Sequence, residues 1–122
     1  MFRFEKLEVW QEAVSYANSV YRLTQSFPDA ERFGLSSQMR RSAVSISANI
    51  AEGASRNTDK DFARFVEISY GSVLENISEA FIARDQGFLK LPDFSRLYAD
   101  AEKLARMLSG LRTTLLKSGP RP

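Results

Sequence analysis

The chain has 122 residues, of which 43% are hydrophobic and 26% are charged, so it fits one soluble globular domain. The chain has seventeen Lys and Arg residues and fifteen Asp and Glu residues. The resulting formal net charge of +2 is smaller than that of a strongly basic nucleic-acid-binding domain. The chain contains no Cys and no His, which excludes disulfides, thiol nucleophiles, zinc–thiolate sites and imidazole catalysis.

The first predicted helix carries two apolar stripes at helical spacing. The stripes consist of Leu7, Trp10, Val14, Ala17 and Tyr21, and of Val9, Ala13, Tyr16, Val20 and Leu23. Two adjacent stripes predict a face wide enough for more than one neighbouring helix. The helix is expected to end at residues 26–29, because Pro28 disfavours helix at the residue before it.

The second predicted helix begins after Gly34, with Ser36 or Ser37 as its N-cap, and continues to about Arg56. It is rich in small residues, which would let another helix approach closely, either inside the bundle or from a neighbouring subunit. These residues are Ala43, Ser45, Ser47, Ala48, Ala51 and Gly53.

The third predicted helix runs from about Asp59 to Gln86, with Thr58 as its N-cap and Gly87 as the residue that ends it. Pro92 suits the first turn of a fourth helix. The fourth helix has an unbroken 3,4 alternation of apolar residues, namely Phe94, Leu97, Ala101, Leu104, Leu108, Leu111 and Leu115.

Nothing in the chain predicts strands, since no stretch alternates apolar and polar residues and no hairpin turn is present. Four long helices with short connections predict an all-α fold, an antiparallel up-down-up-down four-helix bundle. We expect a single domain over residues 1–118, followed by a flexible tail at residues 119–122. No apolar run is long enough to cross a membrane, and no signal-peptide pattern is present, so the expected location is the cytoplasm.

Polar side chains form a stripe beside the apolar face on each of the two central helices. The stripes are Ser45, Asn49, Glu52 and Arg56 on the second helix, and Ser69, Ser72, Asn76 and Glu79 on the third. One interpretation is that they are solvated or fix the helix register through hydrogen bonds. The others are a binding cleft lined by Asn49, Glu52, Glu75 and Glu79, or a subunit interface.

Catalysis is the least supported class of function. No cofactor is predicted, and no metal, although a carboxylate-only magnesium site stays open as an alternative. A nucleophilic Ser45 or Ser72 would need a base placed by the fold, and no motif indicates one. An enzyme would instead need a deep pocket around Glu52, Glu75 and Glu79.

Basic residues are the candidates for contact with nucleic-acid phosphates. Most are Arg, which favours bidentate contacts to phosphate or carboxylate, and scattered Arg paired with nearby acids is the alternative. The candidates are Arg40, Arg41, Arg56, Lys60 and Arg64, followed by Arg3, Lys6 and Arg22. Symmetry could gather a weak patch from each subunit into a strong field.

Several segments together resemble one bacterial four-helix bundle family. They are residues 7–11 (LEVWQ), 38–41 (QMRR), 45–53 (SISANIAEG), 71–75 (GSVLE) and 87–89 (GFL). The family is that of proteins encoded in intervening sequences of large-subunit rRNA genes, which includes the accessory variability determinants (Avd) of diversity-generating retroelements. Its motif positions here are Gln38, Ser45, Asn49, Glu52, Gly53, Gly71, Ser72 and Glu75.

The resemblance implies a cytoplasmic bacterial protein that assembles as a homopentameric ring or barrel, and most members of the family have no established activity. The retroelement members are understood to bind nucleic acid and a reverse transcriptase through a basic surface. The family commonly has Pro where this chain has Ser47, and Leu where it has Asn76. A proline-related bend is therefore not expected here, and the packing around position 76 is expected to differ.

The leading hypothesis is a non-enzymatic oligomer that binds RNA or another nucleic acid without reading its sequence, since no base-stacking motif is present. The main alternative is an adaptor that binds a protein partner, such as a reverse transcriptase, without touching nucleic acid. No membrane partner is expected.

Overall fold

The computed structural model describes residues 1–117, and these residues form helices and no strand. The elements in chain order are η1 (Arg3–Lys6), α1 (Glu8–Thr24), η2 (Asp29–Glu31), α2 (Leu35–Ala54), α3 (Asp59–Asp85) and α4 (Leu91–Lys117). The predicted all-α fold with four long helices is confirmed. The tail predicted at residues 119–122 lies outside the described residues.

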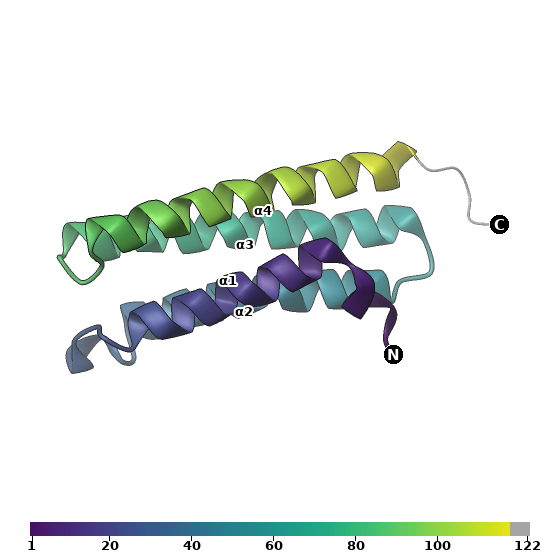
Figure 1. Cartoon of the computed structure of the whole chain (residues 1–122). Helices are drawn as coiled ribbons and strands as arrows, with labels where there is room; N and C mark the ends of the chain where they lie inside the picture. Colours follow the sequence, from purple (N-terminus) through teal and green to yellow (C-terminus); the bar gives the residue numbers. More distant parts are fainter. Residues whose placement is uncertain (118–122) are drawn as a thin grey trace.

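Successive long helices run in opposite directions, and α4 ends at the end of the bundle where α1 begins (Figure 1). In sequence order, α1, α2, α3 and α4 occupy the corners of a square bundle. Each helix packs against two neighbours, since α2 and α4 both contact α1 and α3. This arrangement is the up-down-up-down topology expected from the short connections.

The two apolar stripes of α1 have different neighbours. Val9, Ala13 and Val20 are buried against the bundle. Trp10, on the first stripe, is half-buried, and its ring meets that of Phe4 in η1 edge to face, with 4.9 Å between the centroids. The wide apolar face of α1 is therefore explained by contacts with α2, α4 and a short 3-10 helix, η1, that the sequence did not predict.

The predicted N-cap of α2 is wrong. The helix begins at Leu35, so Ser36 and Ser37 lie inside its first turn. The Leu35 N–H donates a hydrogen bond to the Glu31 carboxylate of η2, at 3.2 Å between N and Oε1. A second unpredicted 3-10 helix thus supplies the cap, which satisfies one of the free N–H groups at the start of the helix.

The predicted ends of α3 are confirmed. The Asp61 N–H donates to the Thr58 hydroxyl at 3.1 Å, which makes Thr58 the N-cap. At the other end, Gly87 has a φ of +78°, a conformation that Gly adopts without the steric strain imposed by a side chain.

Two of the small residues of α2 pack inside the bundle. Ala43 is fully buried in the core. A Cβ added to Gly53 would lie 2.7 Å from Cβ of Phe65 and 2.8 Å from Cδ1 of Phe62, so only Gly allows α2 and α3 to approach this closely. By contrast, Ala48 lies exposed on the outer surface of α2.

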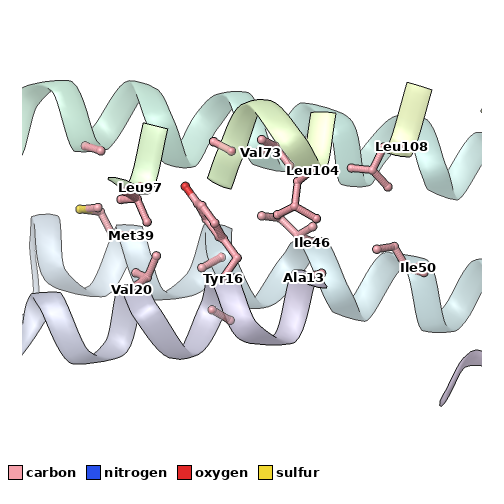
Figure 2. Packing of buried hydrophobic residues seen from close by; sticks show 14 of the residues in the cluster. Ala13, Tyr16, Val20, Met39, Ile46, Ile50, Val73, Leu97, Leu104 and Leu108 are labelled. Atoms are coloured by element: carbon pink, nitrogen blue, oxygen red, sulfur yellow. The ribbon is translucent and has the colours of Figure 1, made fainter. Parts of the chain in front are cut away.

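The apolar core is built mainly from α4 and the inner faces of the other helices. Leu97, Leu104 and Leu108 of α4 are almost completely buried, whereas Leu111 is only half-buried. Figure 2 shows the Tyr16 side chain crossing this core from α1, with its hydroxyl oxygen directed toward α3. A polar atom in such a core needs a hydrogen-bond partner.

Candidate functional site

A polar network lies inside the bundle, with Asn76 at its centre. The Asn76 side chain is fully buried. Its Oδ1 accepts a hydrogen bond from the Tyr16 hydroxyl at 2.6 Å, and its Nδ2 donates to the Met39 carbonyl at 2.8 Å and to the Ser42 hydroxyl at 2.9 Å. One side chain therefore joins α1, α2 and α3.

The network continues to a buried carboxylate. The Ser42 hydroxyl donates to Oε1 of Glu79 at 2.7 Å, and Glu79 is only 8% exposed. Burial raises the pKa of the Glu79 carboxyl above its ordinary value of 4.5, the hydrogen bond from Ser42 opposes this, and the negative charge of Glu75 adds to it. Burial, together with the nearby carboxylates of Asp100 and Glu79, also raises the pKa of the Tyr16 phenol.

Further hydrogen bonds fix the register of α2 against α3. The hydroxyls of Ser45 and Ser72 lie 2.9 Å apart, and the Ser69 hydroxyl donates to the Ile46 carbonyl at 2.8 Å. The third-helix stripe is therefore a satisfied, buried register device, as one of the sequence interpretations predicted.

The four residues of the predicted cleft are not brought together. Glu79 lies inside the bundle, and Glu52 is exposed and paired with Arg56 at 3.0 Å. Asn49 donates to the carbonyl and hydroxyl of Ser45 within its own helix. Glu75 lines a shallow surface groove of about 340 Å³ together with Gln38, Arg41, Ser42 and Ser45.

The buried carboxylate predicts a specific pH dependence of stability. Because the pKa of Glu79 is higher in the folded state than in the unfolded state, its contribution favours folding below the unfolded pKa and is lost as pH rises through the folded pKa. Glu79→Gln is expected to remove this loss while its amide oxygen still accepts from Ser42. The free energy of unfolding of E79Q minus that of the wild type should therefore increase as pH rises from about 4 to about 8. Urea denaturation at several pH values measures this difference, and a difference that stays constant would contradict the assignment.

No group of three or more Asp or Glu side chains in residues 1–117 is placed to hold a metal ion. Within the same residues, no helix has both the length and the apolar character needed to cross a membrane.

Two of the predicted phosphate-binding residues are engaged at helix ends. Arg40 donates to the Thr24 hydroxyl at 2.8 Å, and its guanidinium lies 4.7 Å from the centroid of the Tyr21 ring. Arg3 donates to the Ala54 carbonyl at 3.2 Å. Both residues therefore satisfy or cover groups at the C-terminal ends of α1 and α2.

Three more candidates have neighbours on the surface. Arg56 stacks on the Phe65 ring at 4.5 Å from its centroid, in addition to its ion pair with Glu52. Arg64 pairs with Asp61 at 3.4 Å, and Arg22 donates to the Ser19 hydroxyl at 3.3 Å.

The remaining three candidates, Lys6, Arg41 and Lys60, are exposed, and their side chains make no ion pair or hydrogen bond within residues 1–117. The structure gathers five of the eight candidates at the end of the bundle where η1, the end of α2 and the start of α3 meet (Figure 1). These are Arg3, Lys6, Arg56, Lys60 and Arg64. Arg22 and Arg40 lie at the opposite end.

The sequence reasoning missed the exposed apolar side chains of α3. Ile68, Leu74 and Ile82 are each about half exposed, at 52%, 49% and 52%. The available signal was that these residues fall outside the stripe that supplies the core. On a helix of a single folded chain, such positions are expected to be polar.

The chain is similar to known proteins in both sequence and fold. A family model described as 23S rRNA-intervening sequence protein matches residues 5–110. Among solved structures, it is similar to a protein of unknown function from the S23 ribosomal protein family of Bacteroides thetaiotaomicron, with a TM-score of 0.80. The two are 19% identical, and the match covers 86% of this chain and 95% of that chain, which supports the fold. No curated protein sequence matches the chain.

Proposed function

The chain belongs to the 23S rRNA-intervening sequence protein family. From this premise, we propose that it is a non-catalytic cytoplasmic homo-oligomer that binds the phosphate groups of RNA. The observation that supports RNA binding is the gathering of five candidate basic side chains at one end of the bundle, from three separate segments. Lys6 and Lys60 are the two of these five whose charges are not engaged in an ion pair or hydrogen bond within residues 1–117.

A ring of subunits would strengthen this weak patch. The net charge of one chain is only +2, and the acids at this end of the bundle are partly paired with Arg56 and Arg64. The proposed ring is a pentamer. In a closed ring, the same end of every subunit faces the same way, so that Lys6 and Lys60 recur around one rim. Phosphate contacts alone read no base sequence, so the proposed binding is sequence-independent.

The double variant Lys6→Ala with Lys60→Ala is expected to weaken RNA binding and to reduce its dependence on salt. Each lost phosphate contact lowers the slope of log K against log salt by about 0.7 for a single strand. Fluorescence anisotropy with a labelled single-stranded RNA, between about 50 and 200 mM salt, measures both effects.

The matched control is Lys90→Ala with Arg96→Ala, which removes the same charge from the opposite end of the bundle, where α4 begins. It should bind RNA as the wild type does. Equal weakening in the two double variants would contradict the proposed rim, and wild-type binding that ignores salt would contradict phosphate recognition.

A second candidate function is that of an adaptor for a protein partner, such as a reverse transcriptase. It is favoured by a groove of about 470 Å³ between α3 and α4, whose lining includes Val66, Tyr70 and Leu108. Arg112 and Glu67, joined by an ion pair of 2.6 Å, also line it. An adaptor predicts a stable oligomer that ignores RNA at every salt concentration, and affinity purification that recovers one protein in stoichiometric amount.

A further inference from the structure

The outer surface of α2 between Arg41 and Glu52 lacks the charged residues that a solvent-facing helix normally carries. Ser42–Ala51, more than two turns of helix, contains no charged residue. Val44 is 43% exposed, and Ala48 is exposed on the next turn. Val44 and Ala48 are four residues apart, so they lie on one face of the helix.

The outer surface of α3 is apolar at the neighbouring positions. Ile68 and Ile82 are each 52% exposed and lie two heptads apart, so they share one face of the helix. Gly71 lies between them, and a Cβ added to it would meet nothing within 4 Å.

These two surfaces are continuous. The hydroxyls of Ser45 and Ser72 meet at 2.9 Å, and Ser69 donates to the Ile46 carbonyl. Val44 comes one residue before Ser45, and Ile68 comes one residue before Ser69. Because α2 and α3 run in opposite directions, this places Val44 and Ile68 on the same side of the helix pair, so the two outer surfaces lie side by side. We call the exposed residues Arg41, Val44 and Ala48 the α2 strip, and the exposed residues Ile68, Gly71, Glu75 and Ile82 the α3 strip.

Each strip carries one charge without a partner. Arg41 and Glu75 line the same shallow groove, yet neither makes an ion pair or a side-chain hydrogen bond within residues 1–117. The charges are opposite, and each borders exposed apolar side chains. A partner that covers either strip therefore needs an apolar surface that carries one charge of the opposite sign.

The other strip of a second copy has this composition. We propose that the α2 strip of one subunit packs on the α3 strip of the next, with Arg41 of one chain paired with Glu75 of the other. A contact between two different surfaces of the same chain is heterologous, so it can repeat from subunit to subunit around a closed ring. This inference rests on the proposed homo-oligomer and names the surface that forms it.

Charge reversal tests the contact. Arg41→Glu and Glu75→Arg are each expected to place like charges together and to raise the dissociation constant of the oligomer at least about tenfold. The double variant restores opposite charges and should return the wild-type mass in light scattering coupled to gel filtration. A double variant that dissociates as much as either single variant would overturn the pairing.

The apolar part is tested with Ile68→Glu and Ile82→Glu, since both side chains are half exposed in the single chain and the variants should keep the helical circular dichroism of the wild type. The control is Leu91→Glu, which changes a more exposed apolar residue outside both strips. Dissociation by I68E and I82E but not by L91E supports the surface. An oligomeric wild type that neither variant dissociates overturns the surface alone, whereas a monomeric wild type overturns the proposed homo-oligomer as well.

Discussion

Replacing Asn76 with alanine is expected to lower the free energy of unfolding by about 3 kcal/mol or more. The substitution removes three hydrogen bonds, to Tyr16, Met39 and Ser42. It leaves the Tyr16 hydroxyl without its partner in a core where Tyr16 is only 2% exposed, and an unsatisfied buried group costs about 1–3 kcal/mol. It also opens a cavity at a position with no access to solvent. Urea denaturation followed by far-UV circular dichroism measures the change.

The matched control is Asn49→Ala. Asn49 is also an asparagine inside a helix, but it is half-buried and donates only to Ser45 of the same helix. Because alanine favours helix and no partner on another helix is lost, the expected change is within about 1 kcal/mol. Tyr16→Phe is the second comparison, since it removes the hydroxyl and retains the ring. If N76A and N49A were destabilised equally, the network would not be the main source of register between the helices.

Asn76 also shows how a departure from a family pattern becomes intelligible only in three dimensions. From the family resemblance we expect leucine at this position, and therefore expect the local packing to differ in this chain. The resemblance does not show that Tyr16, on another helix, directs its hydroxyl to the same point. Helical periodicity places a residue on a face of its own helix, but the choice of partner depends on how the helices are aligned along one another.

The helices themselves follow from local patterns. Apolar spacing, the Thr58 cap and the left-handed Gly87 are signals carried within a few residues, and each is confirmed. The second helix begins directly after Gly34, as predicted. Its predicted N-cap was wrong because the capping group, Glu31, belongs to a preceding 3-10 helix. A serine near a helix start is favoured as a cap on average, but a carboxylate held beside the first turn can replace it.

The candidate basic residues were identifiable as a set, but their availability was not. Composition and position placed Arg40 and Lys60 in the same class, although Arg40 is engaged by Thr24 and Tyr21. Whether a guanidinium is free for phosphate depends on carbonyls, hydroxyls and rings from other helices. The exposed apolar positions of α3 were missed for a related reason, because exposure becomes measurable only when the core-facing side of each helix is known.

Gly53→Ala is expected to destabilise the protein by about 1–3 kcal/mol, although alanine is the better helix former by about 1 kcal/mol. The added methyl group would lie 2.7 Å from Cβ of Phe65 and 2.8 Å from Cδ1 of Phe62. Cβ of Phe65 is fixed to the backbone of α3, so the clash is relieved only if α2 and α3 move apart. Such a movement would also stretch the contacts that Ser69 and Ser72 make with α2.

Gly110→Ala is the control, because the two glycines lie inside helices and differ in their surroundings. Gly110 is exposed on α4, and an added Cβ would meet nothing within 4 Å. Only the gain in helix propensity then operates, and G110A should be more stable than the wild type by about 0.5–1 kcal/mol. Thermal denaturation of both variants therefore tests the sign as well as the size of each effect. If G53A were more stable than the wild type, helix propensity would decide the stability change in both variants. This would mean that α2 and α3 do not approach as closely at Gly53 as the contacts of the added Cβ indicate.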